Sequence, residues 1–335
     1  MLSRGVVSNL QSMLELLPID LLERVNREGG LQIADLLDLI SAPKDYTVYD
    51  PTPICDVDVV NSDMAALGDE SLRTGETAVC IFAPEESLQR IPGPELSLLS
   101  LKLLQCSTAT CVWVVTTPSV YDEVQSHLKG LIGVSPRVVP QYETFLLEVN
   151  SRLKLNDNAP SMVSCGTGDV IPALTHSGLL DSFGGRHIAI VNAMNALGAP
   201  VSAMVGEHIT GKKPVTWEVA PREMADETPV LCEHDGIVQL VEVNRLSGVH
   251  KNAFKFTDTG CCVIRSDLQW SSVQWRWDRV RRNRDHSFSV AYQRSITDLC
   301  ATFQTRFLAS PRDSRYLMVD GQLGPRDVPR IFQAI

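Results

Sequence analysis

The chain has 335 residues, of which 44% are hydrophobic and 21% are charged, values typical of a globular protein with a large core. Its formal net charge of −10, from 30 basic and 40 acidic residues, disfavours nucleic acid or an anionic membrane as the main partner. Without an apolar stretch of about 18 residues or a signal-peptide pattern at its start, the chain is expected to be cytoplasmic and not membrane-bound.

The nine cysteines have no disulfide-framework spacing and no CxxC pair. Reduced structural thiols in a cytosolic protein explain this pattern best. The histidines are scattered, without an HxxxH or HExxH pattern. We therefore expect no metal site of the zinc type.

The first 50 residues are expected to form a helical segment. Leucines and a methionine recur at helical spacing at Leu10, Met13, Leu14 and Leu17, and residues 31–40 repeat the pattern. Three prolines make residues 41–63 an extended connector. Residues 63–73 then form a short helix, with Asp63 as its cap.

A strand, a loop and a helix follow, where an α/β sheet usually holds a phosphate. The apolar run 78–82 predicts a buried parallel strand, and residues 96–104 predict a helix. The loop between them has almost none of the glycines that a phosphate cradle needs, and it carries Glu85, Glu86 and Glu95.

Strands and helices continue to alternate along the chain. The expected strands are 110–117, 137–139, 187–191 and 261–264, and the expected helices are 119–129, 171–180, 201–210 and 297–307. The Asp235-Gly236 turn, flanked by alternating strands at 215–219 and 237–243, signals a hairpin. The alternation predicts an α/β fold with a mixed, mainly parallel sheet flanked by helices.

Two further segments are suited to ligand binding. Gly166-Thr167-Gly168-Asp169 is a turn whose glycines let the backbone approach a ligand closely. Asn192-Ala193-Met194-Asn195 follows a core strand, at the carboxyl edge where ligands of α/β sheets bind.

The order of these segments resembles the family of UTP–glucose-1-phosphate and N-acetylglucosamine-1-phosphate uridylyltransferases. The resemblance covers about residues 50 to 335. The matching family motifs, in chain order, are MTS at Thr116-Thr117-Pro118, FxQ at Val139-Pro140-Gln141, GHGD at Gly166–Asp169, VDN at Asn192–Asn195, the glutamate of EY at Glu242, KxFN at Lys255–Asp258 and SRFLPVK at Ser314–Asp320.

The resemblance implies a Rossmann-like, GT-A-like nucleotidyltransferase domain over residues 51–275, completed by residues 276–335. It also implies that the family's C-terminal β-helix is missing. The family joins a sugar phosphate to a nucleoside triphosphate, which requires amide groups of a glycine-rich loop, lysines and magnesium held by a carboxylate.

The chain departs from the family at these phosphate-binding positions. Pro84, Glu85 and Ser87 stand at the loop glycines. Glu95 and Asp320 replace lysines, and Met194 replaces the metal-binding aspartate. Each lost contact to the transferring phosphate should slow the reaction on the order of 10²-fold.

The positions that hold the base and the sugar in the family are retained. They are Gln141, Gly166 and Gly168 for the uracil, and Asn192, Asn195 and Glu242 for the sugar. Thr167 and Asp169 of the same glycine motif are further candidates for binding the nucleotide or sugar. Lys255 is the remaining phosphate-directed lysine and the candidate catalytic residue. Simpler interpretations are a plain turn for the glycines, a helix cap for Asn195, core filling for Met194 and a solvated surface for Glu242 and Lys255.

Three functions stay open. The first is a catalytically impaired family member that binds a nucleotide sugar or sugar phosphate, or serves as a regulatory subunit for a protein partner. The second is an active nucleotidyltransferase with a rebuilt site, which alone would require magnesium, helped by Lys255 and the basic run 276–286. The third is a different transferase on the same scaffold, acting on a cationic substrate. For the basic run, a solvated loop or a face paired with the chain's acidic excess is the alternative.

Overall fold

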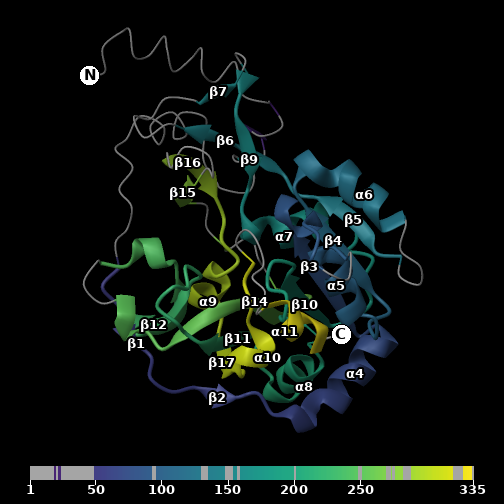
Figure 1. Ribbon diagram of the computed structural model, residues 1–335, viewed down its shortest axis with the longest axis vertical. Coiled ribbons are helices and arrows are strands. Elements are labelled where there is room, and N and C mark those ends of the chain that lie inside the picture. The colour runs from purple at the N-terminus through teal and green to yellow at the C-terminus, as the bar shows by residue number, and fades with distance from the viewer. Residues whose placement is uncertain are drawn as a thin grey trace. The chain divides into compact units, whose positions relative to one another are not determined.

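The computed structural model (Figure 1) describes most of the chain from residue 49 onward. The described residues are 19, 22–23, 49–92, 96–129, 135–147, 154–156, 159–199, 201–247, 251–268, 273, 276–281, 288–319 and 327–333. The expected N-terminal helical segment therefore lies almost wholly outside the described residues, as do Glu95 and Asp320.

The chain groups into two compact units. The smaller unit comprises residues 1–47, 142–169 and 271–296, and the larger unit comprises residues 48–141, 170–270 and 297–335. The boundaries expected at residues 50 and 275 stay predictions.

The larger unit is built on a mixed sheet whose central path has the order β2-β17-β11-β14-β10-β3-β4-β5, with β1, β12 and β13 beside it. Its strands are β1 (Thr52–Pro53), β2 (Asp58–Val59), β3 (Thr77–Ala83), β4 (Val112–Thr116), β5 (Arg137–Pro140), β10 (His187–Asn192), β11 (Val215–Pro221), β12 (Val230–His234), β13 (Ile237–Val241), β14 (Phe256–Arg265) and β17 (Thr305–Ala309). Neighbours along the central path pair in parallel, except that β14 runs antiparallel between β10 and β11. The expectation of a mixed, mainly parallel sheet flanked by helices is confirmed.

Short and long helices connect these strands. The α-helices are α4 (Ala65–Thr74), α5 (Leu98–Gln105), α6 (Tyr121–Lys129), α7 (Val170–His176), α8 (Ser202–Gly211), α9 (Asp298–Thr302), α10 (Arg312–Arg315) and α11 (Asp327–Gln333). The 3₁₀ turns are η1 (Ser62–Met64), η2 (Glu85–Leu88), η3 (Pro118–Val120), η5 (Val243–Arg245) and η6 (Lys251–Ala253).

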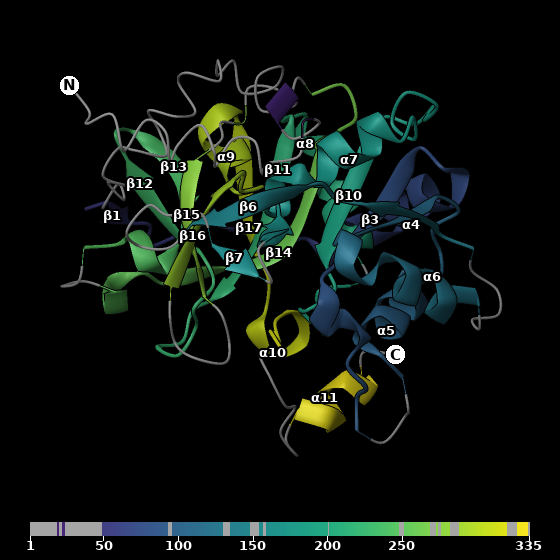
Figure 2. The ribbon, with the colours of Figure 1, turned by 90° about the horizontal axis from the view of Figure 1, so that it is seen from above.

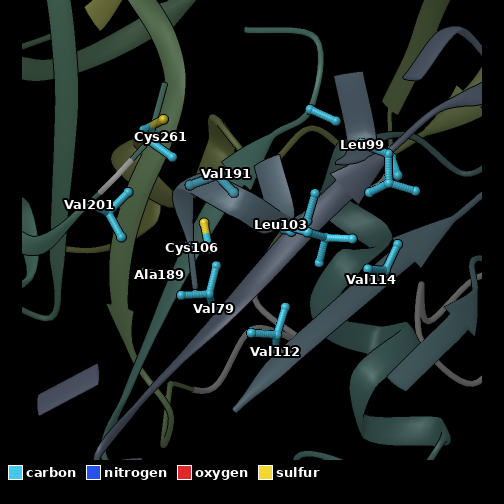
Figure 3. Packing of buried hydrophobic residues seen from close by; sticks show 14 of the residues in the cluster. Val79, Leu99, Leu103, Cys106, Val112, Val114, Ala189, Val191, Val201 and Cys261 are labelled. Atoms are coloured by element: carbon cyan, nitrogen blue, oxygen red, sulfur yellow. The ribbon is translucent and has the colours of Figure 1, made fainter. Parts of the chain in front are cut away.

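The main core lies between one face of this sheet and α4, α5, α6 and α8. Figure 3 shows Leu99 and Leu103 of α5 packed over Val79, Val114 and Val191 of three neighbouring strands. These strand residues are fully buried. Their continuous apolar runs are what a parallel strand covered on both faces requires. Burial of this apolar surface is the main force that holds the helices on the sheet.

The smaller unit contains a four-stranded antiparallel sheet in the order β15-β16-β6-β9 and a separate pair of strands. Its elements are β6 (Glu143–Leu147), β7 (Leu155–Asn156), β8 (Ala159–Pro160), β9 (Met162–Ser164), the 3₁₀ turn η4 (Thr167–Asp169), β15 (Arg276–Arg281) and β16 (Phe288–Gln293). The first half of the basic run 276–286 is thus a strand rather than the solvated loop considered from the sequence.

Three expectations were wrong in detail. Residues 297–307 do not form one helix, because α9 ends at Thr302 and residues 305–309 form β17, paired in parallel with β11. Asp63 is not a helix cap but lies in η1, which is capped by Asn61, whose side chain accepts the N–H of Asp63 at 3.0 Å. α4 begins after η1 and has no side-chain cap. The expected hairpin turn is confirmed, since Asp235 and Gly236 have φ of 52° and 76°, but the strand before it is β12.

Among the described residues, no helix is both long and apolar enough to cross a membrane.

Candidate functional site

The carboxyl edge of the parallel strands in the larger unit brings several sequence motifs together. Asn192 at the end of β10 lies opposite Phe82, and Ala83 lies opposite Thr116. Gln141 follows β5 directly, is only 2% exposed, and its N–H donates to the Thr116 carbonyl at 2.7 Å. This edge is where ligands of open α/β sheets usually bind.

Asn192 begins a tight turn at this edge. Its Oδ1 accepts the N–H of Met194 at 2.9 Å. Gly260 of the neighbouring β14 has a φ of 72°, and a Cβ there would lie 2.8 Å from the Asn192 Cβ. A side chain at position 260 would therefore displace Asn192, which explains the glycine.

The side chain of Asn195 forms hydrogen bonds with the backbone of three separate segments. Its Nδ2 donates to the carbonyls of Thr259 and Arg315 at 2.9 and 3.0 Å. Its Oδ1 accepts the N–H groups of Leu197 and Leu317 at 3.2 and 2.9 Å. Because both amide hydrogens are used within the chain, Asn195 holds the turn in place; the predicted contact with a sugar remains a prediction.

The loop after β3 is not a glycine-type cradle. Pro84 introduces η2, in which the Ser87 N–H donates to the Pro84 carbonyl at 2.9 Å and the Gln89 N–H donates to the Glu86 carbonyl at 3.0 Å. These amides are therefore not directed at a ligand. Glu85 and Glu86 are exposed and would repel a polyphosphate.

Met194 lies in an apolar cluster rather than in a metal site. It packs against a cluster of buried residues that comprises Ile91, Leu98, Leu101, Ala196, Val319 and Ile331. Figure 2 shows α11, which carries Ile331, beside α5. Within the described part of the chain, no group of three or more His, Cys, Asp and Glu residues is suited to a metal ion. The residues at this position do not fit the magnesium ion that the family resemblance implies.

Lys255 and Glu242 lie elsewhere in the larger unit. Lys255 is exposed and precedes Phe256, which pairs with Pro221 at the end of β11. Glu242 is half-buried and precedes η5, where its carbonyl accepts the Arg245 N–H at 2.9 Å. Their predicted roles toward a ligand stay predictions.

The glycine motif belongs to the smaller unit, where it packs against the chain at Arg294. Gly166 has a φ of 88°, and a Cβ there would lie 2.3 Å from the Arg294 carbonyl oxygen. The Gly168 N–H donates to the same oxygen at 3.0 Å. The Thr167 hydroxyl accepts the Ile296 N–H at 3.1 Å. Close backbone approach within the protein thus explains both glycines.

Arg294 also forms a buried ion pair that sequence analysis missed. Its Nη2 lies 3.1 Å from Asp169 Oδ1, and the two side chains are 1% and 0% exposed. Asp169 Oδ2 accepts the Tyr142 N–H at 3.0 Å. The fourth residue of the motif therefore joins three segments of the smaller unit.

Comparison with known proteins shows that part of this chain matches a family model and several characterised enzymes. A family model described as UTP–glucose-1-phosphate uridylyltransferase matches residues 135–263. The enzymes of that name from Pyrus pyrifolia and Solanum tuberosum are 39% and 37% identical over 95 residues, which are 27% of this chain. That match spans only 20% of the length of each relative.

Two solved structures have the same fold over most of this chain. A variant of UDP-glucose pyrophosphorylase from Leishmania major, in complex with UDP-glucose, gives a TM-score of 0.69 at 16% identity and covers 95% of this chain and 77% of its own. The UDP-N-acetylglucosamine pyrophosphorylase from Trypanosoma brucei, in complex with an inhibitor, gives 0.66 at 15% identity and covers 98% and 79%.

Residues 135–263 thus match the model of the UTP–glucose-1-phosphate uridylyltransferase family, and the fold is that of solved UDP-sugar pyrophosphorylases. The structure also contains a second buried ionic group that the motifs did not reveal. Glu218 of β11 is 1% exposed and accepts the Nε of Arg315 at 2.8 Å and the hydroxyls of Ser310 and Thr259 at 2.6 and 3.1 Å. Ionic groups far apart in sequence leave no local pattern.

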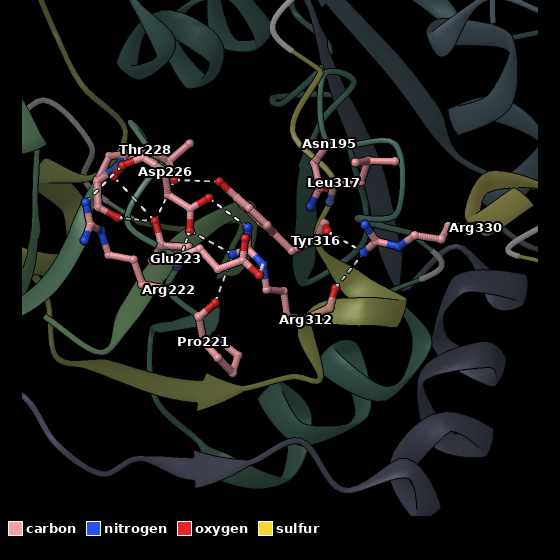
Figure 4. Close-up of polar contacts among 12 residues, drawn as sticks. Asn195, Pro221, Arg222, Glu223, Asp226, Thr228, Arg312, Tyr316, Leu317 and Arg330 are labelled. Carbon is pink, nitrogen blue, oxygen red and sulfur yellow. Dashed lines mark hydrogen bonds and ion pairs between the residues drawn. The ribbon is translucent and has the colours of Figure 1, made fainter. Parts of the chain in front are cut away.

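Two further arginines tie together segments near the C-terminus (Figure 4). Arg312 donates from Nη1 and Nη2 to the two oxygens of Asp226, both at 2.8 Å, and contacts Glu223 at 3.1 Å. Arg330 of α11 donates to the carbonyls of Asp313 and Tyr316 at 3.0 and 3.1 Å. Arg312 fixes the loop after β11, and Arg330 fixes α11 against α10.

Asp258 should give the stability a measurable pH dependence. Burial raises its pKa from 3.8 to about 6, despite hydrogen bonds from Trp217 Nε1 and the Gly260 N–H. Because the folded state binds this proton more tightly, its contribution is complete below pH 3.8 and is lost as the pH rises through about 6. The shift corresponds to a loss on the order of 3 kcal/mol.

Asp258→Asn should therefore flatten the decrease in stability over this pH range, measured as the urea midpoint at several pH values. Asp313→Asn, at a surface aspartate of α10, is the control and should keep the wild-type slope. An unchanged slope in Asp258→Asn would show that this carboxyl does not titrate as described.

Proposed function

We propose that the chain binds a nucleotide sugar or a sugar phosphate through the base-and-sugar half of the family's site, and that nucleotidyl transfer is impaired or absent. The observation that carries the proposal is the apolar environment of Met194, at the position of the family's metal-binding aspartate. An apolar cluster cannot hold a magnesium ion, which requires oxygen ligands.

The loop after β3 supports the same conclusion. Transfer between a sugar phosphate and a nucleoside triphosphate brings two polyanions together, so its rate depends on fixed donors and positive charges around the phosphates. Here the η2 amides are engaged by Pro84 and Glu86, and the exposed side chains are those of Glu85 and Glu86. Both changes oppose triphosphate binding.

The remaining half of the site supports binding of the base and sugar. Gln141 is buried at the carboxyl edge of the sheet, and Asn192 lies at the same edge, as the last residue of β10. The Leishmania major protein of the same fold was solved in complex with UDP-glucose. A ligand of that class is therefore the first to test here.

Calorimetry with UDP-glucose and with UTP, each with and without magnesium, tests the proposal. We expect UDP-glucose to bind with an affinity that magnesium does not change, and UTP with glucose 1-phosphate to release no pyrophosphate. Gln141→Ala should weaken UDP-glucose binding roughly tenfold through loss of a hydrogen bond to the base.

Gln141→Met, which approximately preserves the size of this buried side chain without burying a charge, checks that the loss is not a folding defect and should also weaken binding. Gln239→Ala, on the hairpin strand β13, is the matched control and should bind like the wild type. Pyrophosphate release would contradict the proposal and support an active enzyme in which the exposed Lys255 contacts phosphate. Absence of binding to any of these nucleotides would support a different transferase or a role in protein interaction.

A further inference from the structure

A cleft of about 700 Å³ opens in the larger unit, beside α4, α5 and α8. Sites for small molecules usually have volumes of roughly 300–1,000 Å³. The cleft is lined by Val59, Val60, Ser62, Ala65, Asp69, Leu104, Gln105, Ser107, Thr108, Ser202, Ala203, Met204, Glu218, Ser310, Pro311, Ser314 and Arg315. It thus contains none of the residues assigned to nucleotide or sugar binding.

Two charged side chains of the lining, Arg315 and Glu218, neutralise each other. Arg315 donates two hydrogen bonds to Glu218, at 2.8 and 3.1 Å, and the Ser310 hydroxyl donates to the same carboxylate. Behind the lining, the fully buried Lys102 donates to Gln105 Oε1 at 2.9 Å. Because Arg315 and Glu218 neutralise each other, this part of the cleft offers hydrogen bonds rather than an ionic contact.

The rim of the cleft carries two exposed large apolar side chains among polar ones. Val59 and Leu104 are 67% and 46% exposed, which is high for large apolar side chains. At one side the carboxylate of Asp69 accepts the hydroxyl of Ser202. The Asp69 carboxylate at the rim disfavours an anionic occupant, whereas Val59 and Leu104 favour a ring or a chain.

Two polar side chains that line the cleft, Gln105 and Arg315, also hold the turn that carries Asn192. Gln105 Nε2 donates to the Ala196 carbonyl at 3.1 Å, and Arg315 Nη2 donates to the Gly198 carbonyl at 3.2 Å. Asn195 donates to the Arg315 carbonyl. A molecule that contacts Gln105 or Arg315 therefore contacts the support of the turn 192–198.

We propose that this cleft is a second ligand site, that it takes an uncharged molecule with an apolar ring or chain and a hydroxyl or amide head, and that its occupancy changes the turn 192–198. The head group bonds to Gln105, Ser202 or Ser310, and the apolar part contacts Val59 and Leu104. This site goes beyond the proposed function and does not depend on it.

NMR titration of the full chain with tryptophol tests the proposal, with indole-3-acetate as the anionic probe that has the same ring. Tryptophol should shift the amide signals of Leu104 and Ala203 and also those of residues 194–198. Indole-3-acetate should bind at least about tenfold more weakly, a difference of about 1.4 kcal/mol. No uridine compound is needed, so failure here is separate from failure of the proposed function.

Two neighbouring alanines of α4 provide matched variants. Ala65 lines the cleft and is half-buried, whereas Ala66 is exposed and does not line it. Ala65→Phe should fill the cleft and weaken tryptophol binding at least about tenfold, and Ala66→Phe should leave it unchanged. Leu104→Lys, a change at an exposed position that should not affect folding, should also weaken binding.

Absence of shifts with tryptophol at millimolar concentration would overturn the site, as would tighter binding of indole-3-acetate. Binding that neither Ala65→Phe nor Leu104→Lys reduces would place the probe elsewhere. Shifts confined to Leu104 and Ala203, with none in residues 194–198, would overturn the link to the turn.

Discussion

Replacement of Arg294 by methionine is expected to lower the free energy of unfolding of the smaller unit by about 3–5 kcal/mol. Arg294 and Asp169 are almost fully buried and form an ion pair at 3.1 Å. Methionine fills part of the arginine volume but removes the positive charge that contacts the Asp169 carboxylate. An uncompensated buried charge is far more costly than the lost attraction alone. Urea denaturation followed by circular dichroism measures the change.

The double variant Arg294→Met, Asp169→Asn distinguishes the ion pair from simple packing. Removal of the carboxylate charge should restore part of the stability lost in Arg294→Met, so the double variant should be more stable than the single one. Arg73→Met breaks the exposed pair with Glu70 in α4 and is the control, with an expected change of about 1 kcal/mol or less. Strictly additive losses would mean that the two side chains do not act as a pair.

Strands that are buried on both faces could be predicted from the sequence. β3 and β10 are continuous apolar runs bounded by polar turns, and no amphipathic helix has that pattern. β17 was missed because its five residues follow a short helical stretch without a glycine or proline between them. Its strand conformation depends on pairing with β11, which lies far away in sequence. Tertiary pairing overrode the local pattern there.

In the candidate site, too, some features could be predicted from the sequence and others could not. A glycine turn at 166–168 was evident from the sequence, but its physical cause, the approach of the Arg294 backbone, was not. Met194 was considered as core filling, and the structure places it against the cluster around Ile331. The pairs Asp169–Arg294 and Glu218–Arg315 join residues about 100 positions apart or more, so no spacing rule could reveal them.

The cleft could not be predicted for a related reason. It is formed by the ends of several elements, and each contributes only one to three lining residues. No segment of the sequence has a composition that marks a binding site. Its shape depends on how closely α4 and α8 approach one another.

Because α4 and α8 approach each other so closely, we expect a second large loss of stability for Gly68→Ala. Gly68 of α4 faces α8 so closely that a Cβ would lie 1.8 Å from the Ser202 carbonyl oxygen. Gly206 of α8 makes the reciprocal contact, with its Cβ position 2.1 Å from the Met64 carbonyl oxygen. Because both obstacles are backbone atoms, a methyl group can be accommodated only by separation of the helices. We expect a loss of about 1–3 kcal/mol or more.

The direction of the change makes this prediction decisive. Within a helix, alanine is intrinsically favoured over glycine by about 1 kcal/mol, so propensity alone would stabilise Gly68→Ala. A lower urea midpoint can then come only from the helix contact. Gly184→Ala is the matched control, since nothing lies within 4 Å of its Cβ position, and it should be neutral. If Gly68→Ala were as stable as wild type, the helices would not be packed at this distance. Separation of α4 and α8 would also widen the cleft between Ala65 and Ala203, so Gly68→Ala should weaken tryptophol binding in the same preparation.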